Sequence, residues 1–158
     1  MTPVDRRISC PYIATDAIIR YSNGKSEGIV FIERKNQPYG LALPGGFAEY
    51  GLTLEENVRK EAKEETNLEF DIENPEHPLC VHSQPNRDPR AHIISVFYIG
   101  RGEGLLQAGD DAAKARVYGI DEVIDILGKR IFAFRSHERA ITEYLTREGY
   151  LGKTEVTR

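Results

Sequence analysis

The chain has 158 residues, 40% of them hydrophobic and 29% charged, with a net charge of −4 and a pI near 5.6. This composition is typical of a globular domain and argues against a disordered chain, and no apolar run approaches the ~20 residues of a membrane helix. The acidic pI argues against a broad nucleic-acid-binding surface. Cys10 and Cys80 lack Cys-x-x-Cys spacing, and nothing at the N-terminus resembles a secretory signal. We therefore expect one cytoplasmic domain over residues 1–158, with no nucleic-acid or membrane partner.

The first predicted elements are two antiparallel strands. Apolar, β-branched runs at 10–20 and 28–34 flank an Asn-Gly pair at 23–24, which is a strong signal for a hairpin turn. The Gln-Pro-Tyr-Gly sequence at 37–40 then breaks the strand pattern. After a short apolar piece, the Pro-Gly-Gly sequence at 44–46 predicts a second turn.

The clearest helix is predicted over residues 54–66. Thr53 and Glu56 form a Thr-x-x-Glu capping box at its start. Asn67 follows its last turn, where a residue that tolerates the left-handed conformation is favoured. Its buried stripe is expected to consist of Leu54, Val58 and Ala62, with Leu68 as an extension.

The second half of the chain alternates between predicted strands and helices. Strands are expected at 68–72, 79–83, 92–100 and 115–119, a glycine-rich loop at 102–111, and helices at 121–127 and 136–147. Ser136 is expected to cap the last helix. The inward residues of that helix should be Ala140, Ile141, Tyr144 and Leu145. Strands before, between and after helices predict an α/β fold, with a mixed sheet flanked by helices.

Three carboxylates on the first helix indicate chemistry. Glu61, Glu64 and Glu65 stand at positions i, i+3 and i+4, which lie on one face of a helix. Like charges at this spacing destabilise a helix by about 0.2–0.5 kcal/mol per pair, so folding alone does not favour them. A divalent cation such as Mg²⁺ would favour them, because it binds carboxylate oxygens and bridges to substrate phosphates. The alternative is a solvated surface face.

With the preceding glycine turn, this spacing resembles the signature of the Nudix hydrolases, Gly-x5-Glu-x7-Arg-Glu-U-x-Glu-Glu-x-Gly-U, where U is a bulky aliphatic residue; here it runs from Gly46 to Leu68. The resemblance implies a Nudix-like α/β/α sandwich with a mixed β-sheet. It also implies that Glu61, Glu64 and Glu65 are the catalytic residues and hold Mg²⁺ or Mn²⁺, with the main-chain carbonyl of Gly46 as an additional ligand. The general base stays open between a helix glutamate and an acidic residue on a distant loop.

Three positions depart from this signature: Leu52 replaces Glu, Lys60 replaces Arg, and Asn67 replaces Gly. In the family, the Glu and Arg at the first two positions are thought to hold the loop against the helix. Leu52 cannot form an ion pair, and Lys60 lacks the planar bidentate group of arginine. Lys60 could instead pair with Glu56 or Glu64. We therefore expect an active site with weakened support.

A second informative region begins in the loop before residue 92. Arg87 and Arg90 flank an Asp-Pro pair, and two guanidinium groups in a proline-stiffened loop could bind a diphosphate. The alternative is a surface loop in which Arg and Asp pair locally. The order Arg-Asp-Pro-Arg, His-x-Ile-Ser, Gly-Asp-Asp-Ala-Ala resembles the ADP-ribose pyrophosphatase branch of the family. The candidate substrate-binding residues are Arg34, Arg87, Arg90, Asp110 and Asp111.

Histidines and aromatic residues give weaker signals. The histidines show no metal-ligand spacing and are expected to be structural or solvated: His77, His82, His92 and His137. Three aromatic residues could stack on an adenine or belong to the core: Phe47, Tyr50 and Phe97.

The resemblance implies a hydrolase that splits ADP-ribose into AMP and ribose 5-phosphate. Another Nudix substrate is the first alternative: a nucleotide sugar, a dinucleoside polyphosphate or a noncanonical nucleoside triphosphate. A non-catalytic module that binds ADP-ribose or a related nucleotide is the second, motivated by Leu52 and Lys60. A homodimer is expected by analogy with the family.

Overall fold

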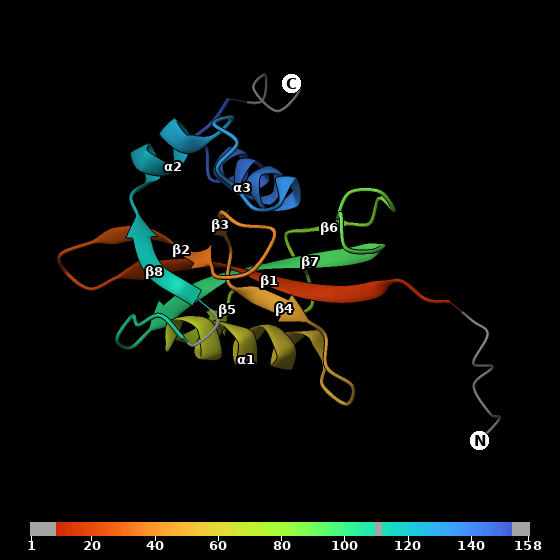
Figure 1. The fold of residues 1–158 in the computed structure, drawn as a ribbon. Helices are drawn as coiled ribbons and strands as arrows, with labels where there is room; N and C mark the ends of the chain where they lie inside the picture. Colours follow the sequence, from red (N-terminus) through yellow and green to blue (C-terminus); the bar gives the residue numbers. More distant parts are fainter. Residues whose placement is uncertain (1–8, 110–111, 153–158) are drawn as a thin grey trace.

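A computed structural model describes residues 9–109 and 112–152. Its described part contains an eight-stranded mixed sheet with helix α1 (Leu54–Thr66) on one face. Helices α2 (Ile120–Ile126) and α3 (Arg135–Arg147) cover the other face (Figure 1). The expected α/β/α sandwich is confirmed. None of the described helices is long and apolar enough to cross a membrane.

Strand β1 (Tyr12–Ser22) lies at the centre of the sheet and changes partner along its length. Its first half pairs with β4 (Gly45–Phe47), and its end pairs with β2 (Glu27–Arg34), both antiparallel. On its other side β1 runs parallel to β7 (Ile93–Glu103). The remaining strands are antiparallel to β2 or β7: β3 (Leu41–Ala42), β5 (Glu69–Ile72), β6 (Cys80–His82) and β8 (Ala112–Tyr118).

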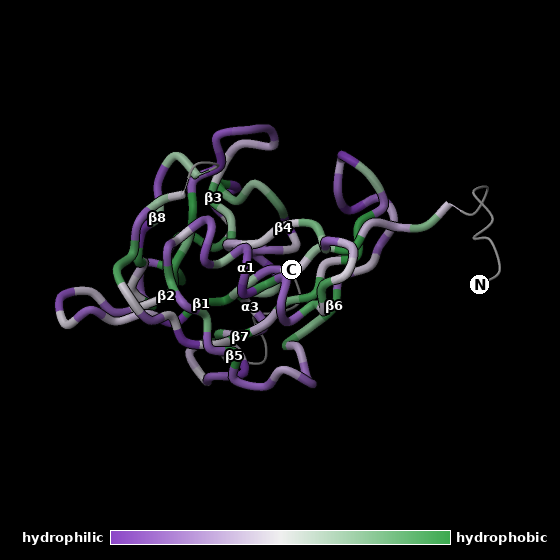
Figure 2. The backbone as a smooth tube through the Cα atoms, turned by 90° about the horizontal axis from the view of Figure 1, so that it is seen from below, coloured by the Kyte–Doolittle hydropathy of each residue, from purple (hydrophilic) through white to green (hydrophobic). Residues whose placement is uncertain are grey.

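The alternating orientation of side chains along the two central strands, β1 and β7, divides the core into two layers. Ala17 and Val96 belong to the cluster that packs under α1, whereas Ile18 and Phe97 belong to the cluster under α2 and α3. Successive side chains of a strand point to opposite faces, so one strand serves both layers. In Figure 2 the apolar stretches gather in the central strands and the hydrophilic stretches lie in the outer loops.

Several glycines that predict loops lie in strands. Residues 45–47 form β4 instead of the second half of a turn, and β7 continues through Gly102 to Glu103. A Cβ on Gly45 would stand 2.3 Å from the Thr15 carbonyl oxygen, and one on Gly102 would stand 2.6 Å from Ile19. These positions need glycine because another chain segment approaches closely, not because the chain turns there.

The helix boundaries were predicted with mixed success. Helix α1 has the expected bounds and capping box, and Asn67 adopts φ 61° after it. Helix α2 begins one residue before the predicted position. The prediction that Ser136 caps the last helix is wrong. Helix α3 begins at Arg135 with Phe134 at the N-cap, and the buried Ser136 hydroxyl has no hydrogen-bond partner among the described residues.

Candidate active site

The carboxylates of α1 occupy different environments. Val58 and Ala62 are fully buried against the sheet, and this orientation turns Glu61 and Glu65 toward β4. The Glu64 side chain remains 55% exposed and lies 2.8 Å from the Lys60 ammonium. The three predicted metal ligands therefore form a half-buried pair beside the glycine strand and one carboxylate at the surface.

The half-buried carboxyl groups of Glu61 and Glu65 lie close to the two glycines of β4. The Gly45 main-chain N–H donates to Glu65 Oε2 at 2.9 Å. A Cβ built on Gly46 would stand only 2.6–2.7 Å from the Glu61 carboxyl group. The absence of a side chain at Gly46 thus provides the space that the Glu61 carboxyl group occupies.

Burial makes the charged forms of these carboxylates costly. The pKa of Glu65 is raised to about 8, chiefly by burial and also by the nearby carboxylates of Glu61 and Asp16, while the Gly45 hydrogen bond opposes the shift. Burial also raises the pKa of Glu61, against the opposing effect of the Lys60 ammonium. Crowded acidic groups of this kind are stabilised by a bound cation, and their oxygen atoms are the ligands that Mg²⁺ and Mn²⁺ accept. The residues fit a divalent metal ion.

Lys60 connects α1 to the loop that follows β4. Its ammonium lies 2.7 Å from Glu49 Oε1 as well as 2.8 Å from Glu64, and both hydrogen bonds raise the pKa of Lys60 above its ordinary value. The Glu49 main-chain N–H also donates to Asn57 Oδ1 at 3.0 Å. The expected pairing of Lys60 with Glu64 is confirmed, whereas Glu56 completes the capping box. Glu49 supplies the ion pair that Leu52 cannot make.

Two of the predicted arginines lie on the aromatic rings beside β4. Arg90 forms a bidentate pair with Asp88, with distances of 2.9 and 2.8 Å, and its guanidinium lies 4.7 Å from the Phe134 ring centre. The Arg34 guanidinium lies 5.0 Å from the same ring, and its Nε donates to the Pro38 carbonyl at 2.9 Å. Cation–ring contacts and charge-assisted bonds hold planar groups in defined orientations.

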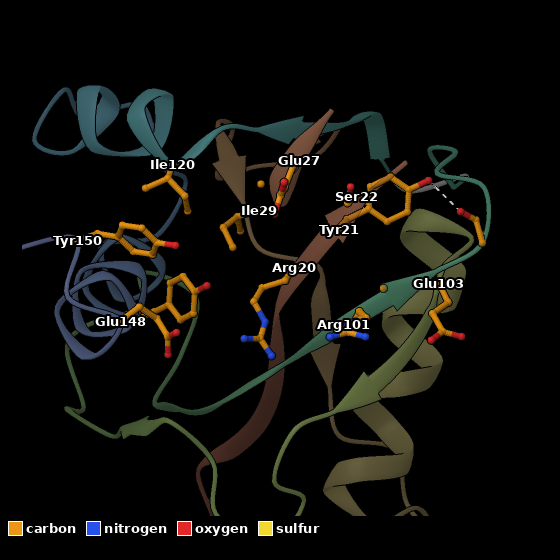
Figure 3. Close-up of a pocket in the computed structure, with 14 residues that line it drawn as sticks. Arg20, Tyr21, Ser22, Glu27, Ile29, Arg101, Glu103, Ile120, Glu148 and Tyr150 are labelled. Carbon is orange, nitrogen blue, oxygen red and sulfur yellow. Dashed lines mark hydrogen bonds between the residues drawn. The ribbon is translucent and has the colours of Figure 1, made fainter. Parts of the chain in front are cut away.

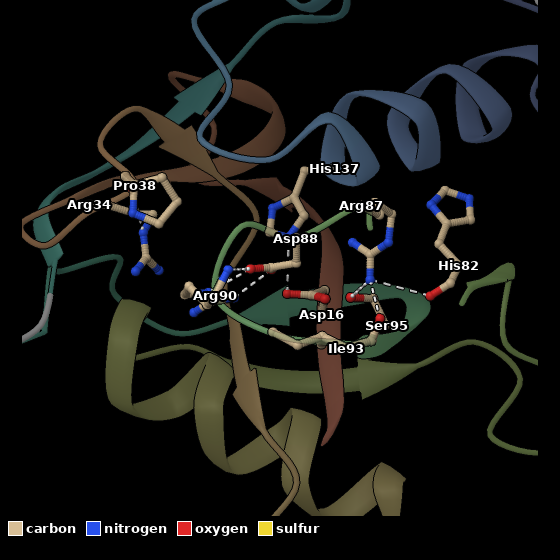
Figure 4. A network of polar contacts seen from close by, with 10 residues as sticks. All are labelled: Asp16, Arg34, Pro38, His82, Arg87, Asp88, Arg90, Ile93, Ser95 and His137. Atoms are coloured by element: carbon tan, nitrogen blue, oxygen red, sulfur yellow. Dashed lines mark hydrogen bonds and ion pairs between the residues drawn. The ribbon is translucent and has the colours of Figure 1, made fainter. Parts of the chain in front are cut away.

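Arg87 is turned inward from the same loop (Figure 4). Its Nη2 donates to the Ile93 carbonyl at 2.6 Å, to Ser95 Oγ at 3.1 Å and to the His82 carbonyl at 3.3 Å. These contacts tie the loop to β6 and β7. Burial lowers the pKa of Arg87, and Asp88 opposes that shift. The three predicted arginines line one pocket with Gly45 and Gly46.

Two further residues line the pocket: Asp16, which was not among the predicted candidates, and His137, which was expected to be structural or solvated. His137 Nδ1 accepts the Leu43 main-chain N–H at 3.0 Å, so its Nε2 carries the proton of the neutral ring and faces Asp16 Oδ1 at 3.3 Å. Asp16 is only 5% exposed. An acidic residue inside an apolar strand pattern was the available signal, because a buried carboxylate requires partners.

Three buried polar atoms around this pocket have no hydrogen-bond partner in the described part of the chain: Asp16 Oδ2, Arg87 Nε and Ser136 Oγ. Buried polar groups are usually paired, so such a concentration indicates a site that receives a polar ligand. The pocket measures about 50 Å³, which is enough for a polar group but not for a dinucleotide. A large ligand would extend from it along the surface.

A larger cavity of about 890 Å³ lies away from these groups (Figure 3). It is lined by the ends of β1 and β7, the start of β2, and the C-terminal residues Glu148 and Tyr150. Its Arg20 is already paired with Glu73 at 2.7 Å. Of these two cavities, only the smaller pocket adjoins the carboxylates of α1, and we therefore take the smaller pocket as the candidate active site.

The other predicted candidates have varied positions. Asp110 and Asp111 lie outside the described residues. Phe97 is fully buried in the core and Tyr50 is fully exposed, while Phe47 is 43% exposed beside Arg90. Of the three aromatic residues, Phe47 alone lines the pocket.

Comparison with known proteins agrees with this geometry. Residues 11–142 match the family model of the NUDIX domain. The chain is 43% identical over 138 residues to an ADP-ribose pyrophosphatase of Methanocaldococcus jannaschii, an alignment that covers 85% of this chain and 73% of that protein.

Solved structures share the fold. One is the NUDIX domain of Shewanella oneidensis NrtR in complex with ADP ribose, with TM-score 0.75 and 18% identity, covering 93% of this chain and 94% of that chain. Another is a bifunctional NMN adenylyltransferase/ADP ribose pyrophosphatase from Francisella tularensis, complexed with AMP and a manganese ion. Its TM-score is 0.70 with 23% identity, covering 90% of this chain and 43% of that chain. At these identities the likeness concerns the fold alone.

Proposed function

The chain belongs to the Nudix family and is a Nudix pyrophosphohydrolase, and from this premise we propose that it hydrolyses ADP-ribose to AMP and ribose 5-phosphate. The observation that carries the proposal is the position of β4. The carboxylates of Glu61 and Glu65 lie against its two glycines, and the same glycines line the pocket of three arginines. The 43% identity to an ADP-ribose pyrophosphatase supports the choice of substrate.

Glu61, Glu64 and Glu65, with the main-chain carbonyl of Gly46, would hold the divalent cation, which we propose to be Mg²⁺, with Mn²⁺ as the alternative. When bound, such an ion neutralises charge on the phosphate oxygens and lowers the pKa of the attacking water. The protein contributes the orientation: the Gly45 N–H fixes one Glu65 oxygen, and Lys60 fixes one Glu64 oxygen. Each of these two carboxylates keeps a second oxygen for a metal ion.

The arginines are the proposed substrate-binding groups. Arg34 and Arg90 are preoriented by Pro38, Asp88 and the Phe134 ring, so binding a diphosphate with them would cost little side-chain entropy. The buried, unpartnered Nε of the half-buried Arg87 would donate to a substrate oxygen inside the pocket. Asp110 and Asp111, which lie outside the described residues, are also proposed to bind the substrate.

Release of AMP from ADP-ribose in the presence of Mg²⁺ tests the proposal directly. We expect Glu64→Gln to reduce the rate strongly, because it removes a charged ligand from an exposed position where the fold should tolerate the change. Glu76→Gln, an equivalent substitution in an exposed loop, serves as the matched control and should retain the rate. Equal rates for the wild type and Glu64→Gln would refute this metal site.

A substrate panel separates ADP-ribose from the other Nudix substrates. ADP-ribose should yield AMP and a sugar phosphate, whereas a nucleoside triphosphate would release pyrophosphate and no sugar phosphate. Faster hydrolysis of a nucleotide sugar, a dinucleoside polyphosphate or a triphosphate would reassign the substrate. Magnesium-independent binding of ADP-ribose without turnover, measured by calorimetry, would identify a binding module.

Three further parts of the proposal concern the whole chain. We assign residues 1–158 to one Nudix domain and place the protein in the cytoplasm, where free thiols such as Cys10 and Cys80 stay reduced. A homodimer is proposed by family analogy. Light scattering would test it against the chain mass of 17.9 kDa.

A further inference from the structure

A second group of metal-ligating side chains lies on the opposite face of the sheet from α1. Cys80 and His82 stand two residues apart on β6, so both side chains point to the same face. That face carries α3, as the contact of the His82 ring with the Phe97 ring at 5.2 Å indicates. Glu143 of α3 meets them there, with its Oε1 3.1 Å from His82 Nε2.

We propose that Cys80, His82 and Glu143 bind a zinc-class transition-metal ion at a site separate from the carboxylates of α1. One ligand atom from each residue lies within 4.8 Å of the other two. Ligand atoms about 2.0–2.3 Å from a tetrahedral zinc ion are about 3.3–3.8 Å apart, so side-chain movements of about 1 Å would bring the three ligands into place. The Cys-x-His spacing on a strand brings two of the three ligands together without any special backbone conformation.

The donor set selects the class of metal. A thiolate and an imidazole favour zinc, copper or cobalt, whereas Mg²⁺ prefers oxygen ligands alone. One thiolate and one carboxylate neutralise the charge of a divalent ion, which reduces the electrostatic cost of holding it in a half-buried place. This chemistry distinguishes the site from Glu61, Glu64 and Glu65, which supply only oxygen.

The surroundings allow an ion to enter and hold its ligands in place. His82 is 8% exposed, and its Nε2 is the nitrogen that faces the cluster, because it lies 3.1 Å from Glu143 Oε1. The Glu143 side chain is 40% exposed and leaves an open side where water can complete a tetrahedral site.

Metal binding would compete with a proton at the thiol. Burial raises the pKa of Cys80, and the Glu143 carboxylate adds to the effect, so the thiol is protonated at neutral pH without an ion. On binding, the S–H bond breaks, a metal–sulfur bond forms, and the proton passes to solvent. The bound ion would connect β6 to α3 and act as a structural link.

Cobalt(II) provides a test that responds to sulfur. Titration of the purified protein with Co²⁺ should give the near-ultraviolet cobalt–thiolate charge-transfer band at a stoichiometry of one ion. Cys80→Ser should abolish the band. Cys10→Ser, which removes the other, exposed thiol, should retain it, and so should Glu64→Gln, which alters the α1 site. Glu143→Gln keeps Cys80 and should weaken cobalt binding at least about tenfold.

Zinc should also stabilise the fold. At a free zinc concentration 100-fold above Kd, we expect Tm to rise by about 5–10 °C in the wild type and in Cys10→Ser, and by clearly less in Cys80→Ser, where only the carboxylates of α1 remain to bind the ion. No thiolate band in the wild type, or a band that depends on Cys10, would overturn the proposal. Loss of the band in Glu64→Gln would likewise overturn it. These readouts do not use ADP-ribose hydrolysis, so they stand or fall independently of the proposed activity.

Discussion

At the scale of single residues, the proposed active site combines a position that has no side chain, Gly46, with carboxylates whose charged form burial makes costly. Gly46 has no Cβ, and the Glu61 carboxyl group fills that space. Glu65 is buried with a raised pKa beside the Gly45 N–H. The spacing of these glutamates places them on one helix face but does not distinguish them, because burial is set by the strand that packs beside the helix.

We expect Gly46→Ala to reduce turnover of ADP-ribose about 10–100-fold while leaving Tm nearly unchanged. The new Cβ would stand 2.6–2.7 Å from the Glu61 carboxyl, which is the far end of a flexible side chain and can move aside. Activity would be lost because the carboxylate leaves its position, not because the fold breaks. Gly152→Ala is the matched control, since a Cβ there meets nothing within 4 Å. A large fall in Tm, or full activity, would contradict this account.

Glu65 should make the stability of the metal-free protein depend on pH. Its folded-state pKa of about 8 exceeds the ordinary value of 4.5, so its contribution is fully present below pH 4.5 and is lost as the pH rises through 8. Glu65→Gln keeps a neutral side chain at every pH. With a chelator present, we expect this variant to exceed the wild type in unfolding free energy by on the order of 2 kcal/mol at pH 8.5.

Chemical denaturation of both proteins at pH 5, 6.5 and 8.5 measures that difference. Comparing the two proteins removes the contribution of other titrating groups. The difference should grow with pH, and added Mg²⁺ should reduce it by stabilising the wild type selectively. A difference that stays constant across this range would show that Glu65 is charged throughout.

At the scale of elements, α1 and the loop after β4 act as one unit. The capping box starts the helix, Val58 and Ala62 orient it, and Lys60 reaches back to Glu49 in the loop. The family signature places the loop carboxylate at the position of Leu52, so its fixed spacing indicates no partner for Lys60 in the loop. The structure supplies such a partner three residues earlier, at Glu49, which the fixed spacing of the signature does not indicate.

Removing this brace should affect activity more than stability. The Glu49–Lys60 pair is exposed, and such pairs contribute about 0.2–1 kcal/mol to stability. We expect Glu49→Gln to lower kcat about tenfold, because Lys60 and the loop lose their shared orientation. Glu69→Gln removes a comparable exposed pair with Lys63 on the same helix and should leave kcat unchanged. Equal kcat values for the two variants would show that the Glu49–Lys60 pair is a surface ion pair with no effect on catalysis.

At the scale of the whole molecule, the pocket forms where β1 exchanges β4 for β2 as its partner. Segments distant in sequence meet there: Arg34 from the end of β2, Arg90 from the loop before β7, and Phe134 from the start of α3. The other end of α3 packs on the face where Cys80 and His82 lie. One helix thus contributes to both proposed sites.

Arg90→Lys tests whether this assembly orients the substrate. Lysine keeps the charge but loses the bidentate contact with Asp88 and the planar contact with Phe134. We expect KM for ADP-ribose to rise about tenfold with little change in kcat, because the loss concerns binding and not the metal site. Arg59→Lys, at an exposed position of α1, is the control. An unchanged KM would remove Arg90 from the substrate-binding residues.

The sequence alone determined the features that depend on local patterns. Strand alternation, the capping box at Thr53, the left-handed Asn67 and the spacing of the three glutamates all involve neighbouring residues, and backbone geometry translates them directly into structure. Glycines were misinterpreted where they permit close approach instead of a turn, as at Gly45, because sequence does not show which segment approaches.

Only the tertiary structure decided the contacts between distant segments. Two such contacts are the Asp16–His137 pair and the approach of Cys80 to Glu143, which join residues far apart in the sequence. The burial of Glu65 but not of Glu64 also depends on the strand that packs beside the helix. The physical reason is that burial and electrostatics depend on the whole arrangement of neighbours in three dimensions. A pattern within one helix or strand identifies candidate side chains, and the packing of the sheet determines which of them share a site.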